Sequence, residues 1–235
     1  MKFQVYLNYA LKKQLENFPA LYISLLRWKY RNHWFKKRII NENTDIVIEG
    51  FPRSANSFFV KAFALAQNHQ VNIATHVHSH VHVLEAIRRQ KPVVVLIRHP
   101  DEAIVSLKAL FIESAGKGNN SYPQMPIHLM IDWYIRFYSQ LLPYKSKFVL
   151  AKFDDVTSNI DIVIENINKK FNTAFHPFGH TKENELKIIE NARFHLAPSE
   201  LRNKIKMQVK NEYFDKNNKK LRDLALQTYL EMTHE

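Results

Sequence analysis

The chain has 235 residues, 46% of them hydrophobic, which is enough to bury one substantial core and argues against disorder. It has no cysteine, so disulfides and thiolate chemistry are excluded. The formal net charge of +12 indicates an anionic partner, which charge alone leaves as nucleic acid, a membrane surface or a multiply charged small ligand. The sequence contains no uncharged apolar run of about 18 residues, so no transmembrane helix is predicted. No secretory signal is recognisable, and we expect a cytoplasmic protein.

Residues 1–43 are expected to form a helical N-terminal segment. Apolar residues recur in it at helical spacing, and a basic run extends from Arg27 to Arg38. One interpretation is a helix that packs on the core and leaves its basic face in solvent. The other is a peripheral membrane contact, with Trp28 and Trp34 as interfacial anchors.

The middle of the chain alternates short apolar strands with helical segments. Residues 92–97 (PVVVLI) are apolar and β-branched without polar alternation, which is typical of a strand buried on both faces of a parallel sheet. The predicted strands are 45–49, 71–75, 92–97 and 147–153. The predicted helices are 57–67, 81–90, 101–114, 127–142 and 158–171.

This alternation predicts an α/β fold of three layers, in which a parallel sheet is flanked by helices. We expect a single domain over 1–235, with an α/β core at 44–175 between the helical segments 1–43 and 176–235. In sheets of this kind ligands bind at the carboxyl ends of the strands, and the polar motifs of this sequence fall there.

The first of these motifs runs from Gly50 to Ser57 (GFPRSANS) and joins a buried strand to a helix. Backbone N–H groups and the dipole at a helix start favour anions, so a phosphate-binding loop is expected here. The spacing overlaps the Walker A pattern G-x-x-x-x-G-K-[ST], but Ala55 replaces its second glycine and Asn56 replaces its lysine. A cation is instead present at Arg53, which indicates a different phosphorus or sulfur ester.

The segment GFPRSANSFF resembles the 5′-phosphosulfate loop of sulfotransferases that use 3′-phosphoadenosine 5′-phosphosulfate (PAPS). The resemblance implies that Arg53 is the catalytic cation of the loop and that Ser54, Asn56 and Ser57 occupy its phosphate-binding positions. Ala55 stands where the family usually has glycine, and alanine tolerates a positive φ poorly. The family also implies a P-loop NTPase-like sulfotransferase fold.

The second motif begins at Arg98, directly after the strand at 92–97. Its sequence RHPDEAIVS resembles the 3′-phosphate motif of the same family, with Arg98 and Ser106 in the binding positions and His99 in place of asparagine. Arginine supplies forked donors and serine a single one, so the two can converge on one phosphate. A Walker B strand would end in an aspartate that helps to hold Mg²⁺, which weighs against an NTPase.

Four histidines alternate in the segment THVHSHVH, which ends at His82. In an extended chain they could bind zinc, but a helix is expected to begin near Ser79 and would break that face. Many soluble sulfotransferases carry a catalytic histidine in a T-H segment at about this position, so the resemblance favours His76 as the general base, with His78 second. His80 and His82 are expected on the helix surface.

Phe153 closes the fourth predicted strand, where the family often has a tyrosine that contacts adenine. Phenylalanine could stack on the base without donating a hydrogen bond, and a core position is the alternative. The C-terminal phosphate motif of the family is not recognisable. Four basic residues of the helical tail remain candidates for that contact: Arg193, Arg202, Lys204 and Lys206.

Together the motifs predict a PAPS-dependent sulfotransferase that needs no metal and uses Arg53 and His76 in catalysis. The acceptor is expected to be a small molecule, a glycan or a lipid, entering over the loop 116–125 and the aromatic helix at 127–142. A nucleotide kinase or NTPase with a degenerate loop is one alternative. A basic protein that binds nucleic acid or a membrane surface is another, although we expect no nucleic acid partner.

Overall fold

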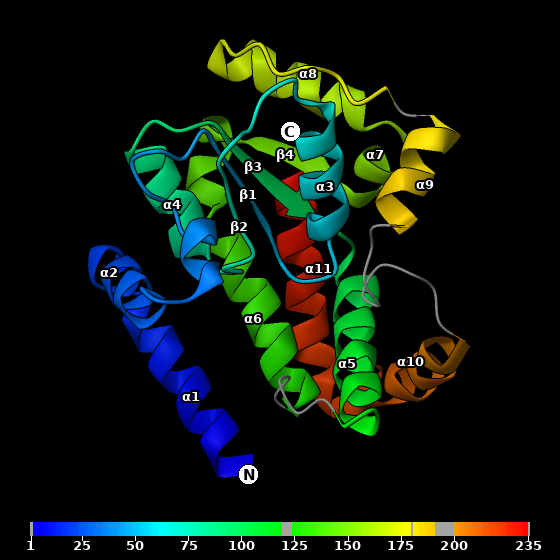
Figure 1. The fold of residues 1–235 in the computed structure, drawn as a ribbon. Helices are drawn as coiled ribbons and strands as arrows, with labels where there is room; N and C mark the ends of the chain where they lie inside the picture. The colour runs from blue at the N-terminus through cyan, green and yellow to red at the C-terminus, as the bar shows by residue number, and fades with distance from the viewer. Residues whose placement is uncertain (1, 119–123, 180, 191–199, 235) are drawn as a thin grey trace.

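The computed structural model describes residues 2–118, 124–179, 181–190 and 200–234. Its core is an α/β fold with a four-stranded sheet in the order β2-β1-β3-β4, and every pairing is parallel (Figure 1). The strands are β1 (Ile46–Gly50), β2 (Ile73–Thr75), β3 (Val93–Ile97) and β4 (Val149–Lys152). All residues of β1 and β3 are buried, as the unbroken apolar run of β3 predicts, and the buried residues of β1 include the charged Glu49.

Helices cover both faces of the sheet, so the predicted layering of helix, sheet and helix is present (Figure 1). Side chains alternate along β1: Ile46 and Ile48 pack on one face and Val47 on the other. The first face is covered by α3 (Asn56–Ala66), α8 (Ile160–Phe171) and α9 (Lys182–Glu190). The second face packs against α4 (His80–Arg88), α5 (Pro100–Gly116), α6 (Ile127–Ser139), α10 (Glu200–Tyr213) and α11 (Lys219–Thr233).

The N-terminal segment is helical, as predicted, but it is divided into three pieces. These are α1 (Lys2–Leu15), α2 (Pro19–Lys29) and the 3-10 turn η1 (Trp34–Arg38). Pro19 stands at the first position of α2, where its fixed φ and missing N–H are tolerated. Two further 3-10 turns are η2 (Leu142–Lys147) and η3 (Lys216–Asn218). Among the described helices, none has the length and apolarity that a bilayer crossing would require.

The fourth strand is shorter than the sequence predicts. It ends at Lys152, and Phe153 begins a separate short helix, α7 (Phe153–Ser158). Asp154 and Asp155 lie in the first turn of α7, where carboxylates favour the positive end of the helix dipole. The expectation that the strand reaches residue 153 is therefore wrong by one residue, and α7 was not foreseen.

The connections after β1 and β3 leave the sheet on opposite faces. β1 continues into α3 on one face, whereas β3 continues into α5 on the other. Where adjacent parallel strands diverge in this way, ligands of α/β proteins bind at the carboxyl ends of the strands, and we call this end of β1 and β3 the crevice. Both sequence motifs lie at this crevice.

Gly50 permits the close approach of β1 and β3 at this edge. A Cβ built on Gly50 would collide with the backbone oxygen of Leu96 and would lie 2.9 Å from the Leu96 Cβ. We expect Gly50→Ala to lower the free energy of unfolding by about 1–3 kcal/mol, because the two central strands must separate to accept the methyl group. Denaturant unfolding followed by circular dichroism measures the change.

The matched control is Gly116→Ala at the end of α5, where an added Cβ meets nothing within 4 Å. This variant should be neutral or more stable by up to about 1 kcal/mol, because alanine favours a helix over glycine. Equal stabilities of the two variants would show that the strand contact at Gly50 is not tight.

Candidate anion-binding site

The loop after β1 forms a tight turn into α3. Ala55 has φ 68° and ψ 15°, a left-handed conformation, and is the N-cap of α3. The Asn56 side chain closes the turn, because its Nδ2 donates to the Phe51 carbonyl at 2.9 Å. The first N–H groups of a helix have no partner within it, which makes the start of α3 a place where an anion can bind. Ala55, at the position where the sulfotransferases that this loop resembles usually have glycine, thus adopts the left-handed conformation that glycine favours.

The Tyr138 side chain of α6 is hydrogen-bonded to this loop and to β3. Its hydroxyl donates to the Leu96 carbonyl at 2.7 Å and accepts the Phe51 N–H at 3.2 Å. Ser54 is fully buried, with its Oγ 3.5 Å from the same hydroxyl. Burial raises the pKa of Tyr138 well above its ordinary value, so the phenol stays protonated as a donor. The aromatic helix therefore braces the loop through a residue whose role in the sequence was open.

Arg53 and the second motif meet across the crevice. The Arg53 Nε donates to the Ser106 Oγ at 3.1 Å, although the two residues are far apart in the chain. Arg98 donates from Nη1 to the Arg53 carbonyl at 3.3 Å and lies 3.4 Å from the Glu102 carboxylate. The structure thus brings together Arg53, Arg98 and Ser106, which the sequence motifs nominate separately.

Phe153 lies beneath the guanidinium of Arg98. The Arg98 Cζ is 3.9 Å from the centre of the Phe153 ring, within the range of a cation–π contact. Phe153 is partly exposed at the start of α7 rather than in the core. On the opposite side, the Tyr134 hydroxyl donates to the Arg98 carbonyl at 2.7 Å. Arg98 is therefore fixed by its backbone and its planar group is stacked on an aromatic ring.

His76 lies beside the start of α3. Its Nε2 is 3.0 Å from the Ser57 Oγ, and its Nδ1 is 2.9 Å from the Thr75 Oγ1. Burial lowers the pKa of His76 to about 3, and the neighbouring His78 and Arg38 charges lower it in the same direction. His76 is therefore neutral at neutral pH and belongs to the same site as the loop.

The buried carboxylate of Glu49 organises the histidine segment, although the sequence motifs did not assign it a role. Glu49 accepts the N–H groups of Val77 at 2.8 Å and His78 at 3.1 Å. It also accepts the His82 Nδ1–H at 2.8 Å, while the His82 Nε2 accepts the Ile40 N–H at 2.9 Å. Burial acts to raise the pKa of Glu49, but the hydrogen bond and charge of His82 and the nearby His78 lower it below its ordinary value.

His80 and His82 do not lie on the helix surface, so that expectation is wrong. Both side chains are buried: His82 bonds to Glu49, and His80 lies 4.0 Å from Glu16 of the N-terminal segment. Helical periodicity alone did not indicate that α2 packs against α4. Among the described residues, no three histidine, aspartate or glutamate side chains lie close enough together to hold a metal ion.

Of the described basic candidates in the tail, Lys206 is the one whose pKa responds to the charges of the site. Burial lowers the pKa of the Lys206 ammonium, the positive charges of Arg98 and Arg53 lower it further, and the Glu102 carboxylate acts to raise it. Arg202 instead makes a buried ion pair with Glu113 at 2.6 Å. Lys204 is exposed to solvent. The fourth candidate, Arg193, lies outside the described residues.

The expected acceptor entrance is described only in part, because residues 119–123 lie outside the described ranges. In the aromatic helix, Tyr134 and Tyr138 are buried in the core. The Trp133 Nε1 donates to the His78 carbonyl at 3.2 Å, and His128 lies 3.2 Å from the Tyr6 hydroxyl of α1. This helix thus supports the site, and α1 packs along its outer side.

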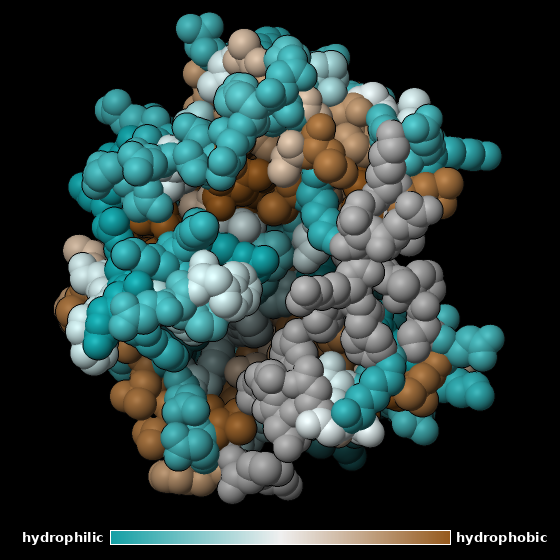
Figure 2. Space-filling view, viewed as in Figure 1, coloured by the Kyte–Doolittle hydropathy of each residue, from teal (hydrophilic) through white to brown (hydrophobic). Residues whose placement is uncertain are grey.

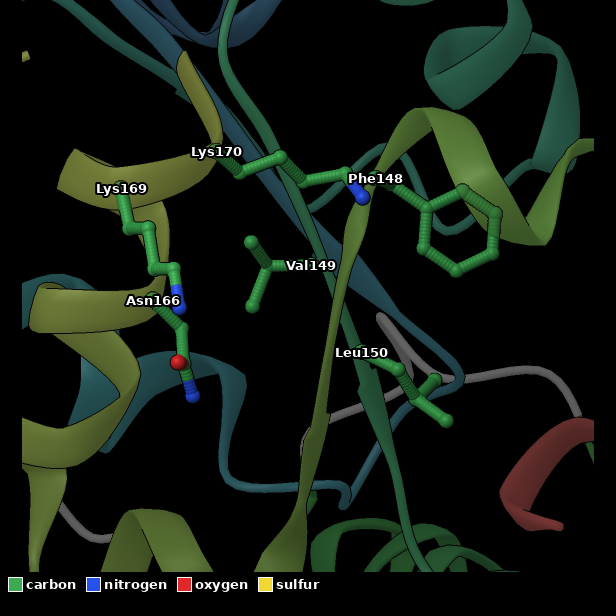
Figure 3. A pocket seen from close by; sticks show the side chains of 6 residues that line it. All are labelled: Phe148, Val149, Leu150, Asn166, Lys169 and Lys170. Atoms are coloured by element: carbon green, nitrogen blue, oxygen red, sulfur yellow. The ribbon is translucent and has the colours of Figure 1, made fainter. Parts of the chain in front are cut away.

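A shallow hollow exists at the other edge of the sheet. It lies between the start of β4 and the end of α8, where the Lys170 side chain extends toward Phe148 and the Lys169 side chain lies beside Asn166 (Figure 3). Because β4 begins there, the hollow is at the amino ends of the strands and is separate from the crevice that holds Arg53 and Arg98.

No protein-family model matches this chain, and no curated protein matches it. The arrangement that the structure shows is that of an α/β protein with a cationic crevice at the carboxyl ends of β1 and β3. Its contents are two arginines, a lysine, helix-terminal amides and a neutral histidine. Such a set can bind a compact, multiply charged anion and remove a proton beside it.

The left-handed backbone at Ala55 leads to a stability prediction. An L-residue with a Cβ pays about 1–2 kcal/mol in this conformation, and glycine does not. We expect Ala55→Gly to raise the free energy of unfolding by about 1 kcal/mol. The control is Ala64→Gly at an exposed position inside α3, which should lower it by about 0.5–1 kcal/mol. Chemical denaturation measures both, and destabilisation of similar size in the two variants would contradict the strained turn.

Proposed function

We propose that the protein is a sulfotransferase that transfers a sulfonate group from PAPS to a hydroxyl or amine acceptor. The observation that carries the proposal is the meeting of the two motifs: Arg53 of the β1 loop donates to Ser106 at 3.1 Å, and Arg98 donates to the Arg53 carbonyl at 3.3 Å. Each motif resembles a different half of a PAPS site, and a ligand with two separate phosphate groups would need both.

The residues of the crevice fit the donor in charge and chemistry. The amides at the start of α3, with Arg53 and Ser57, would hold the phosphosulfate end. Arg98, Ser106 and Lys206 would hold the 3′-phosphate, because their donors lie at the neighbouring strand end. Ala55 contributes the turn that exposes the amides, and the Asn56 side chain closes it on Phe51. Phe153 offers an aromatic face for adenine beside Arg98.

In the proposed reaction the acceptor oxygen or nitrogen bonds to sulfur as the bond from sulfur to the 5′-phosphate oxygen breaks. The acceptor proton passes to His76, and adenosine 3′,5′-bisphosphate leaves. Arg53 and the loop amides stabilise negative charge on the sulfonate and on the leaving oxygen. Holding both groups in line supplies much of the rate, since positioning replaces an encounter in solution.

His76 has the lone pair that a base needs, because its lowered pKa keeps it neutral. A neutral imidazole with a pKa of about 3 is a weak base on its own. A bound anion would favour the imidazolium and raise that pKa toward the ordinary range of histidine. The proton transfer thus depends on occupancy of the adjacent anion site, which would limit unproductive protonation in the absence of donor.

We expect adenosine 3′,5′-bisphosphate to stabilise the fold against heat much more than AMP does, because only the former has a group for Arg98 and Lys206. At about 100 times its dissociation constant it should add about 2.7 kcal/mol. Arg98→Ala should weaken its binding by about 2 kcal/mol, and Lys206→Ala should weaken it too. The matched controls are Arg88→Ala and Lys204→Ala, at exposed positions, which should bind as the wild type does.

Equal thermal shifts by the bisphosphate and AMP would contradict the proposal that Arg98, Ser106 and Lys206 hold the 3′-phosphate. Stronger stabilisation by ATP with Mg²⁺ would instead favour the nucleotide kinase or NTPase alternative. In that alternative an aspartate after β3 would help to hold Mg²⁺. The carboxylate of Asp101, which follows β3, instead accepts a hydrogen bond from the Tyr213 hydroxyl at 2.7 Å.

His76→Ala should separate chemistry from binding. The variant should retain affinity for the bisphosphate and lose about 10²–10⁴-fold in sulfonate transfer, because a general base has been removed. Arg53→Ala should impair both. Transfer is measured as bisphosphate release from PAPS with a panel of sugars, phenols and lipid alcohols, and His69→Ala at an exposed position is the control. Wild-type turnover in His76→Ala would move the base elsewhere, first to His78.

A further inference from the structure

The N-terminal helices expose an unusual number of large apolar side chains. On α2, Leu21, Leu25 and Trp28 follow the spacing of one helical face, and Trp28 is 66% exposed. Trp34 of η1 is 61% exposed. Further exposed apolar residues of this region are Phe3, Leu7, Leu11 and Phe18. We call the outward side of α1, α2 and η1 the N-terminal surface, and apolar atoms are visible along its α1 part at the lower left of Figure 2.

The inward sides of α1 and α2 make the contacts that attach these helices to the rest of the domain. Tyr9 of α1 donates to Asp132 of α6 at 2.8 Å, and Lys13 pairs with the same carboxylate at 3.0 Å. Tyr22 and Ile23 of α2 are buried in the core cluster. Each helix therefore already has an inward face that docks it to the domain. The outward apolar residues are additional to what the fold needs.

Positive charge accompanies the exposed aromatic residues. The sequence has six lysines and arginines and no carboxylate between Glu16 and Glu42. The Arg31 Cζ lies 4.9 Å from the ring centre of Trp28, and the Arg38 Cζ lies 4.7 Å from that of Trp34.

Three more cations of this stretch are exposed, namely Lys29, Lys36 and Lys37. Within the described part of the chain, none of the three forms an ion pair with a carboxylate. The N-terminal surface is thus apolar and cationic at once.

The combination of exposed apolar side chains and positive charge distinguishes between possible binding partners of the N-terminal surface. A second copy of the same surface would bring like charges together, which costs free energy at an interface. Nucleic acid would satisfy the cations through its phosphates but would leave the aliphatic leucines of α1 and α2 without a role. An anionic bilayer satisfies both, because its headgroups attract lysine and arginine while tryptophan and leucine enter the boundary with the acyl chains.

We propose that the N-terminal surface binds peripherally to an anionic membrane, with Trp28 and Trp34 at the boundary between headgroups and acyl chains. The inference does not rest on the proposed function, since none of these residues lies in the cationic crevice. The surface is nonetheless joined to the site: Lys12 of α1 donates to the His78 carbonyl at 3.4 Å, and Ser79 donates to Glu16 at 2.7 Å.

The test is co-sedimentation of the full chain with vesicles of phosphatidylcholine alone or mixed with phosphatidylglycerol. The wild type should sediment only with the mixed vesicles. Trp28→Ser with Trp34→Ser should lower the partition coefficient about tenfold or more, because two large aromatic groups are lost. In a second variant, Lys29→Gln, Lys36→Gln and Lys37→Gln should each contribute a loss of about fivefold.

Matched controls carry the same kinds of change on other faces. Lys169→Gln, Lys170→Gln and Lys182→Gln remove the same charge, and Ile162→Ser with Leu224→Ser removes exposed apolar groups. Both controls should bind vesicles as the wild type does. Circular dichroism and thermal unfolding verify that every variant is folded.

Failure of the wild type to bind mixed vesicles would overturn the proposal, as would equal losses in the controls and in the surface variants. Two other outcomes would also overturn it. One is a dimer in light scattering that the Trp28→Ser and Trp34→Ser variant abolishes. The other is salt-sensitive binding of duplex DNA through the same residues without vesicle binding. None of these results would bear on the bisphosphate measurements, so the two proposals stand or fall separately.

Discussion

The carboxylate of Glu49 lies fully buried near the end of β1, and burial of a charge is costly unless donors surround it. Here the donors are the N–H groups of Val77 and His78 and the ring of His82, all within 3.1 Å. These bonds tie the exit of β2 and the start of α4 to the central strand. His76 consequently occupies a fixed place beside α3, and without the carboxylate the segment that carries it would lose three of its hydrogen bonds to β1.

Backbone strain is concentrated where the two strand exits meet. The described residues include six non-glycine positions with positive φ, and four of them are Arg53, Ala55, His76 and His78. Each costs of order 1–3 kcal/mol and persists only where surrounding contacts enforce it. Glu49 supplies that enforcement on the histidine side and the Tyr138 hydroxyl supplies it on the loop side. The strained positions thus belong to the two segments that carry Arg53 and His76.

The sequence predicted the parts of the site that depend on neighbours in the chain. The strand-to-helix turns that contain Arg53 and Arg98 are local motifs, and parallel strands necessarily bring their ends to one edge. The role of Glu49 could not be predicted, because its partners lie 28 to 33 residues away; its one signal was a carboxylate inside an apolar strand. The choice of Lys206 likewise required the packing of α10 on α5, which periodicity does not specify.

The attachment of α10 has a thermodynamic consequence. This helix is pinned to α5 near both ends, by the ion pair of Arg202 with Glu113 and by the hydrogen bond of Tyr213 to Asp101. Between these two contacts lies Lys206, whose pKa is lowered by burial and by the charge of Arg98 and is raised by the Glu102 carboxylate. If an anion bridges Lys206 and Arg98, reciprocity of linked equilibria requires that anion binding favours the docking of α10 by the same factor by which the docking of α10 favours anion binding. The helix α10 would then contribute to the affinity of the site, in addition to the two strand ends that define it.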